Sequence, residues 1–337
     1  MAHNDTATRV MGPVFDAMRG FEPDAVRAEL AKAAPAAVFR MCHPFGTLKG
    51  ADAYCDAVLL PLAQAMQDLR RQEVIRIAGR DQDGAMWVGS CGAYTGKWVQ
   101  DWLGIPATGC FATMRFHEFY RIERGACVEM QAVWEIPEMM MQADLWPMVP
   151  QLGRFQHAPA PMTQDGRGPH AAALTEASRQ HVIDMLTAMI RHPLQGGPEV
   201  MELERYWHPQ FMWYGPCGIG TACGIEEFRR CHQIPFLNAM PDRGQYPEKT
   251  THHVMAEGAY VGVTGWPDMC QTLSGDGWLG LPPLGRQITL RSLDFWRLEN
   301  GKIRENWVLV DLLDIYAQIG VDVFARMEEL KWSRGYR

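Results

Sequence analysis

The sequence predicts an α+β fold made of two tandem copies of one domain, each with a curved, mainly antiparallel sheet covered by helices. The stretch WLGIPATG at 102–109 returns as WLGLPPLG at 278–285, and FYRIERG at 119–125 returns as FWRLENG at 295–301, both 176 residues later. Self-similarity in the same order over so long a span indicates duplication. Within each copy, apolar residues change from a helical period to a period of two. Hairpin turns are expected at Gly84, Gly125, Gly258 and Gly301.

Each copy should begin with helices, continue through a short apolar stretch, a further helix and four strands, and close with a helix. The expected helices are 5–20, 23–34, 50–69 and 137–146 in the first copy, and 172–191, 198–206, 224–239 and 312–328 in the second. The short apolar stretches are 36–41 and 211–215. The expected strands are 73–79, 85–95, 111–123 and 126–136, then 250–256, 259–266, 286–298 and 302–311. Helices followed by an antiparallel meander are typical of an α+β domain.

The two copies are separated by a segment rich in Pro, Gly and Gln at 147–170, which is the composition of a linker. We therefore expect a first domain at 1–150, a linker at 151–170 and a second domain at 171–337. Length agrees with this division, because 337 residues suit two domains of ordinary size.

Composition excludes several classes of protein. The net charge of −7 argues against binding to nucleic acid or to an anionic membrane surface, since both require a basic face. No apolar run is long enough to span a bilayer and no signal peptide is evident, so a cytoplasmic protein is expected. The nine cysteines include no C-x-x-C pair. We expect reduced thiols and no metal site, with a disulfide framework as the minor alternative.

The second copy contains GWLGLPPLGRQITLRSLDFWRLENGKIRENW at 277–307 and VDLLDIYAQIGVDVF at 310–324. These stretches resemble the SnoaL-like polyketide cyclases, which belong to the nuclear transport factor 2-like group. The first copy resembles the same family more weakly, through WLGIPATG and FHEFYRIERG at 116–125. The resemblance implies cone-shaped domains in which the sheet wraps a cavity closed by helices. It also implies a cyclase without metal or organic cofactor, whose carboxylate moves a proton beside a substrate carbonyl during an aldol closure.

Asp311 is the first candidate for that carboxylate, because it stands downstream of the E-N-W motif where the resemblance places the catalytic acid or base. Alternation along 303–311 puts Glu305, Trp307 and Asp311 on one side of a strand. Its counterpart in the first copy is Glu135. Asp311 equally fits the N-cap of the helix that follows, and both alternatives stay open.

His252 and His253 are candidates to assist, although only one of two adjacent strand residues can face the cavity. The first copy has no histidine at the matching positions, which favours the second copy as the active one. A packed or solvated histidine is the alternative. Metal binding by this pair is not expected, because no third ligand stands at a useful spacing.

Further residues are candidates for substrate binding, either as aromatic walls or as matched acidic positions. The aromatic side chains could instead be ordinary core, and Glu305 could pair with Arg297 or Arg304. The substrate-binding candidates are Trp213, Tyr214, Trp266, Asp294, Trp296, Glu305, Trp307 and Glu135.

The leading function is a cofactor-independent lyase or isomerase of the aldol-cyclase type, acting on a small apolar or aromatic molecule that contains a carbonyl group. The alternatives are an epoxide hydrolase or hydratase in the same pocket, and a non-catalytic protein that binds an apolar ligand. Duplication would build an internal pseudo-dimer. A homodimer of the whole chain stays open.

Overall fold

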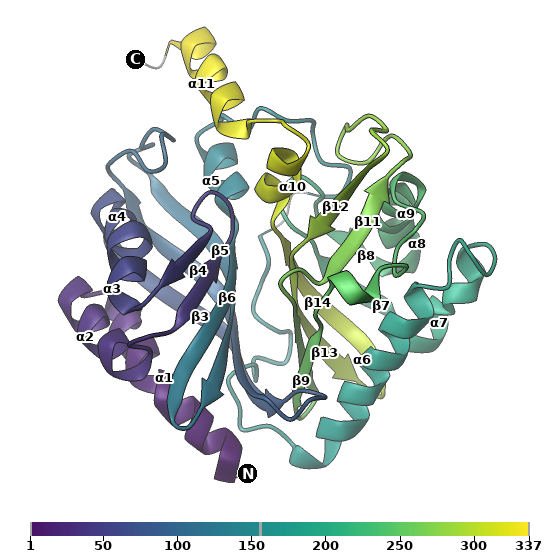
Figure 1. Ribbon diagram of the computed structural model, residues 1–337, viewed down its shortest axis with the longest axis horizontal. Helices are drawn as coiled ribbons and strands as arrows, with labels where there is room; N and C mark the ends of the chain where they lie inside the picture. The colour runs from purple at the N-terminus through teal and green to yellow at the C-terminus, as the bar shows by residue number, and fades with distance from the viewer. Residues whose placement is uncertain (1, 155–156, 336–337) are drawn as a thin grey trace.

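The computed structural model describes residues 2–154 and 157–335, and it contains two six-stranded sheets, each covered on its outer side by helices (Figure 1). The strand orders are β2-β1-β6-β5-β4-β3 and β8-β7-β14-β13-β10-β9. Neighbouring strands are antiparallel except for β1 with β6 and β7 with β14, which occupy equivalent places in the two sheets. The predicted α+β fold with two tandem, mainly antiparallel domains is confirmed. The limits at 1–150 and 171–337 stay a prediction.

The first domain begins with two helices and ends with α5. Its helices are α1 (Ala2–Gly20), α2 (Pro23–Ala33), α3 (Ala51–Tyr54), the π-helix η1 (Cys55–Leu59), α4 (Leu60–Ala65) and α5 (Ile136–Gln142). Its strands are β1 (Val38–Met41), β2 (Thr47–Lys49), β3 (Met66–Arg80), β4 (Met86–Trp98), β5 (Phe111–Glu123) and β6 (Ala126–Trp134). The helix predicted over 50–69 ends early, because Met66 already pairs with Trp98 in the sheet.

The second domain repeats this order. Its helices are η2 (Ala172–Leu174), α6 (Thr175–Met189), η3 (Pro198–Met201), α7 (Leu203–Tyr206), α8 (Gly224–Phe228), the π-helix η4 (Arg229–Gln233), α9 (Ile234–Ala239), η5 (Pro247–Lys249), α10 (Leu312–Gln318) and α11 (Val323–Arg334). Its strands are β7 (Trp207–Tyr214), β8 (Ala222–Cys223), β9 (His253–Glu257), β10 (Tyr260–Thr264), β11 (Met269–Leu273), β12 (Arg286–Leu290), β13 (Ser292–Glu299) and β14 (Lys302–Val310). Both domains thus carry a π-helical turn just before a proline. The four predicted hairpin glycines all have positive φ.

The long central strands of the first domain are interrupted in the second. The segment 286–298, predicted as one strand, is divided at Arg291 into β12, which pairs with β11, and β13, which pairs with β10 and β14. Pro267, which has no N–H, falls between β10 and β11. The hairpin of β11 and β12 therefore forms a separate two-stranded sheet. This break opens space inside the second domain.

The two domains pack through equivalent residues of their sheets. Phe119 and Phe295, which are 176 residues apart, stack with ring centroids 4.8 Å apart and planes at 19°. His117 and Leu293 share the same offset, and the His117 Nδ1 atom lies 2.6 Å from the Leu293 carbonyl oxygen. Contacts between equivalent residues are the signature of a twofold relation.

The segment between α5 and η2 contains no helix or strand among its described residues and crosses between the two sheets (Figure 1). Its Pro159 carbonyl accepts a hydrogen bond from the Trp307 indole N–H at 2.9 Å. Its Gly166 carbonyl accepts from the Arg76 N–H at 2.8 Å. The linker is therefore in contact with both domains. Within the described residues, no helix combines the length and apolarity needed to cross a bilayer.

Candidate active site

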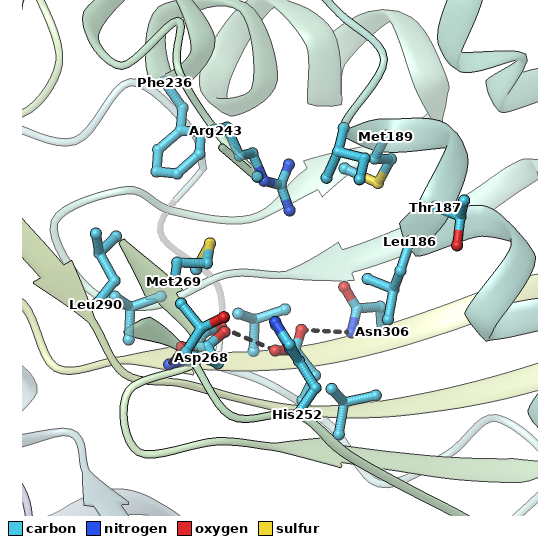
Figure 2. Close-up of a pocket in the computed structure, with 18 of the residues that line it drawn as sticks. Leu186, Thr187, Met189, Phe236, Arg243, His252, Asp268, Met269, Leu290 and Asn306 are labelled. Carbon is cyan, nitrogen blue, oxygen red and sulfur yellow. Dashed lines mark hydrogen bonds between the residues drawn. The ribbon is translucent and has the colours of Figure 1, made fainter. Parts of the chain in front are cut away.

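A cavity of about 510 Å³ lies in the second domain, between the sheet and the elements that cover it (Figure 2). That volume is within the range of small-molecule sites. Its lining comes from α6, β7, β13, β14, the α8–α9 region and the β11–β12 hairpin. The apolar wall includes Leu186, Met189, Trp213, Phe236, Trp278 and Trp296.

The polar part of the cavity is built around Ser292, the first residue after the break between β12 and β13. Its N–H donates to the Asp268 carboxylate at 2.7 Å, and its hydroxyl donates to the Asp294 carboxylate at 2.8 Å. The Asn306 amide donates to the other oxygen of Asp294 at 3.3 Å. One serine therefore holds two carboxyl groups side by side in an otherwise apolar cavity.

The two carboxyl groups differ in acidity. Burial raises the pKa of Asp294 to about 6, against the opposing hydrogen bonds from Ser292 and Asn306. Burial also raises the pKa of Asp268 well above its usual range, and the neighbouring Asp294 adds to the shift. At neutral pH Asp294 is mostly ionised, and the raised pKa of Asp268 makes it a better proton donor to a ligand than an ordinary carboxylate. A pair of groups with separated pKa values is typical of an acid and a base that act together.

Three basic side chains also line the cavity. Burial lowers the pKa of His252, and the nearby Arg243 lowers it further, so His252 is neutral at pH 7. His232 stacks on Trp213 with ring centroids 4.4 Å apart, and burial lowers its pKa to about 3. Arg243 projects into the cavity on the side away from Asp268 (Figure 2).

The equivalent place in the first domain is closed by an ion pair. Glu118, which corresponds to Asp294, is fully buried and accepts from the Arg71 guanidinium at 2.8 Å. That guanidinium also lies over the Phe116 ring, at 4.1 Å from its centroid. Glu118 accepts further hydrogen bonds from Tyr94, Tyr120 and Trp134 at 2.7–3.0 Å. Its oxygens are thus fully engaged by the protein.

Asp311 does not appear among the residues that line the cavity of the second domain. One of its oxygens accepts from the Asp314 N–H at 3.2 Å and caps α10. The other accepts from the His43 N–H of the first domain at 3.0 Å and from Arg291 at 3.1 Å. Burial raises its pKa to about 7, with Asp314 adding to the shift. The geometry corresponds to the capping alternative and to a contact between domains.

The alternation predicted along 303–311 is present, but the cavity lies on the other face of β14. Asn306 and Val308 line the cavity. Glu305 and Trp307 face the linker, where Glu305 accepts from the Met162 N–H at 3.2 Å and pairs with Arg297 at 2.5 Å. The linker covers this face of β14, whereas α6, the α8–α9 region and the β11–β12 hairpin enclose the cavity on the other face.

The remaining candidates fall into two groups. Trp213, Asp294, Trp296 and His252 line the cavity. Tyr214, Trp266, His253 and Glu135 do not. Tyr214 donates to Glu305 at 3.3 Å, and Trp266 lies beneath the Arg291 guanidinium, which is 4.7 Å from its ring centroid.

Glu135 lines a second pocket, of about 290 Å³, between the domains. Its carboxylate pairs with Arg115 at 2.5 Å and accepts from the Cys217 N–H at 2.7 Å. Arg115 in turn donates to the Gly215 carbonyl at 2.7 Å. These contacts join the first domain to the loop that carries Gly215 and Cys217 in the second.

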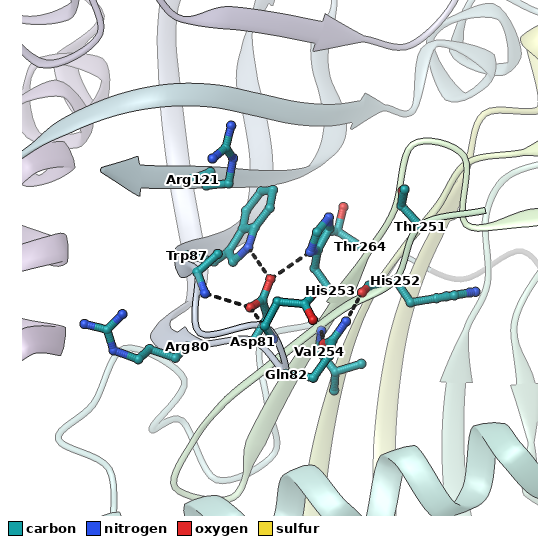
Figure 3. A network of polar contacts seen from close by, with 12 residues as sticks. Arg80, Asp81, Gln82, Trp87, Arg121, Thr251, His252, His253, Val254 and Thr264 are labelled. Atoms are coloured by element: carbon teal, nitrogen blue, oxygen red, sulfur yellow. Dashed lines mark hydrogen bonds and ion pairs between the residues drawn. The ribbon is translucent and has the colours of Figure 1, made fainter. Parts of the chain in front are cut away.

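The first domain reaches the cavity through the turn between β3 and β4 (Figure 3). Gln82 in this turn lines the cavity; its side chain donates to the His252 carbonyl and accepts from the Val254 N–H at 3.1 Å. Beside it, Asp81 accepts from His253 Nδ1 at 2.7 Å. The turn therefore contacts the main chain on both sides of His253 and the His253 side chain itself. The two histidines face opposite ways, as expected for neighbouring residues of extended chain.

The side chains of Asp81, Asp83 and His253 lie close enough together to hold a metal ion. The spacing of these residues in the sequence did not predict such a site. The Asp81 oxygens, however, already accept four hydrogen bonds within the described structure. The donors are the N–H groups of Asp83 and Ala85, the Trp87 indole and His253. The cluster is accounted for as a turn cap and a contact between domains.

Sequence reasoning missed Asp268, Ser292, Arg243 and Gln82. Asp268 follows a Trp-Pro pair that interrupts the period of two, and that interruption was the one available signal. Gln82 comes from the other domain and could not be found from repeat matching.

Residues 197–319 match the sequence model of the SnoaL-like polyketide cyclases. Among curated proteins, none matches the sequence. Similar solved structures include a "putative SnoaL-like polyketide cyclase" from Jannaschia sp., 17% identical, with a TM-score of 0.36, covering 46% of this chain and 98% of that one. A "putative polyketide cyclase" from Streptomyces antibioticus is 21% identical, with a TM-score of 0.33, covering 43% and 99%. An NTF2-like protein from Burkholderia thailandensis is 19% identical, with a TM-score of 0.32, covering 41% and 96%.

The second domain is thus similar in sequence to the SnoaL-like polyketide cyclases over residues 197–319, and the first domain has the same strand order. The resemblance inferred from the repeated motifs is confirmed.

Proposed function

We propose that the second domain is a cofactor-independent lyase or isomerase of the aldol-cyclase type, acting on a small aromatic or apolar molecule with a carbonyl group. The observation that carries the proposal is the pair of carboxyl groups, Asp268 and Asp294, held by Ser292 in an apolar cavity. The resemblance pointed to Asp311, but Asp294 is the carboxylate that lines the cavity.

In this proposal the ionised Asp294 removes a proton from the carbon next to the substrate carbonyl. The protonated Asp268 donates a hydrogen bond to the carbonyl oxygen, which gains negative charge as the enolate forms. The enolate carbon then attacks a second carbonyl carbon of the same molecule, and the new alkoxide takes a proton from Asp268. The proton on Asp294 returns to Asp268 through solvent or the product hydroxyl. His252, neutral and within the same cavity, assists by hydrogen bonding.

The same two carboxyl groups could instead activate water for epoxide opening or hydration, and a cavity that only binds its ligand is the third possibility. The aldol type is favoured because residues 197–319, which include both carboxyl groups, match the polyketide cyclases. A pure binding site has no need for a carboxylate that is ionised at neutral pH in an apolar cavity, since such a charge is costly to bury.

The proposal is tested by following deuterium exchange at the carbon next to the carbonyl of α-tetralone, a bicyclic aromatic ketone, by NMR. The rate should rise about tenfold per pH unit below pH 6 and level off above it, because Asp294 must be ionised to act. Asp268→Asn should show the same rise of the exchange rate with pH but reach a lower maximal rate. Exchange no faster than in buffer, at every pH, would contradict the proposal.

Gln82→Ala should lower the maximal exchange rate about tenfold, because the variant releases the main chain at His252 and Val254 from the first domain. The KM for α-tetralone should change little, since the apolar walls are untouched. Asp83→Ala is the matched control, because it lies in the same turn and its side chain is exposed. Equal rates for the two variants would show that Gln82 does not position the site.

A further inference from the structure

One guanidinium in the cavity has no hydrogen-bond or ion-pair partner within the described residues, and Asp268 and Asp294 act on its charge only from a longer distance. Arg243 follows α9, is half-buried and lines the cavity. No described side chain or carbonyl accepts a hydrogen bond from it, and no described carboxylate lies within ion-pair distance. Its guanidinium carbon lies 5.6 Å from the centroid of the Phe236 ring. Its N–H donors are therefore available to a ligand in the cavity.

The other buried arginines are treated differently by this fold. Arg71, Arg115 and Arg297 each pair with a buried glutamate, at 2.8, 2.5 and 2.5 Å. A guanidinium in apolar surroundings is otherwise costly, so an unpaired one at a cavity wall indicates that the ligand supplies the acceptor. The fork of N–H donors matches a carboxylate in bidentate geometry.

The opposite side of the cavity supports this assignment. Asp268 lies across the cavity from Arg243 (Figure 2), and the ionised Asp294, which Ser292 holds beside Asp268, repels an anion there. The two ends of the cavity therefore select different parts of one ligand. Trp278 and Trp296 line the walls between these two ends. Aromatic walls with a cation at one end and carboxyl groups at the other suit a planar acid that also carries a carbonyl group.

We propose that Arg243 binds an acidic group of the substrate, so that this site takes aromatic or polyketide-type carboxylic acids and holds their carboxylate away from the reacting carbonyl. This inference rests on the proposed function, because it concerns the substrate class of the same cavity. It extends that function by naming the charge that the substrate carries.

The test uses two probes of the same shape, 2-naphthoate and the neutral 2-naphthamide, with binding measured by isothermal titration calorimetry at pH 8. The wild-type protein should bind the carboxylate at least about tenfold more tightly than the amide. Arg243→Met should abolish that preference, and Arg243→Lys should keep part of it. Arg291→Met is the matched control, since Arg291 pairs with Asp311 and Asp314 and should leave the preference unchanged. Melting curves for every variant check that the fold is intact.

Equal affinities for the two probes in the wild-type protein would overturn the inference, and so would a preference that survives in Arg243→Met. Failure to bind either probe would overturn it as well. Exchange of α-tetralone is measured separately and does not depend on Arg243. A protein that exchanges α-tetralone but does not prefer the carboxylate would thus retain the proposed chemistry and lose only the acidic substrate class.

Discussion

Asp294→Asn is expected to lower the rate of α-tetralone exchange by a factor of about 100 or more. The amide keeps the size of the side chain, and it can still accept from Asn306 and donate to the Ser292 hydroxyl. It cannot take a proton at neutral pH, and general base catalysis contributes about 10²–10⁴ in rate. The rise in rate through pH 6 should disappear in the same variant, because the group that titrates there is gone.

The stability of Asp294→Asn at alkaline pH should be equal to that of the wild-type protein or higher, although its activity is lower. The folded pKa of Asp294 lies above its value in the unfolded chain, so the folded state binds this proton more tightly. The stabilisation that this provides is complete below pH 4 and is lost as pH rises through about 6. At pH 8 the Asn variant should therefore melt at the wild-type temperature or above it. Full activity in Asp294→Asn would refute the assignment of Asp294 as the general base. If Asp294→Asn melts at a much lower temperature, its activity is not informative, and the activity of Asp268→Asn is then the test of the carboxyl pair.

Glu118→Gln, at the matching position of the first domain, is expected to lower the stability of the protein and to leave the exchange rate unchanged. Removing the charge leaves the buried Arg71 guanidinium without its main partner, and breaking a buried ion pair typically costs about 3–5 kcal/mol. The melting temperature should fall on the order of 10 °C. The exchange rate per folded molecule should be unchanged well below the melting temperature, because Glu118 is enclosed within the first domain.

The two variants form a matched pair, because Glu118 and Asp294 are 176 residues apart and replace one another in the repeat. Calorimetric melting and the exchange assay, run on both proteins, separate a structural carboxylate from a catalytic one. If Glu118→Gln abolishes exchange while keeping its stability, the active carboxylate belongs to the first domain.

The sequence contained most of the fold. Repeat spacing and the change of period located both sheets, because a strand with one buried face must alternate. Breaks within strands were not predictable in the same way. Arg291 is surrounded by strand-forming residues, and its equivalent in the first domain, Arg115, lies within the unbroken strand β5. The pairing of β12 with β11 instead of with the main sheet is visible only in the structure.

The candidate site was predicted in part. Asp294, His252, Trp213 and Trp296 line the cavity, whereas Asp311 serves a cap. Alternation tells which residues share a face of β14, but it does not tell which face is hollow. That depends on what covers each side, and here the linker and the other domain decide it.

The stacking of Phe119 on Phe295 has a consequence for how the two halves can change over time. In an assembly of identical subunits, every substitution is made twice, so a buried Arg–Glu pair that closes one hollow closes both. Joining the subunits in one chain removes that constraint while the contact near the axis keeps them together. One half is then free to become a rigid support, and the other can accumulate the breaks, unpaired donors and costly charges that ligand chemistry requires.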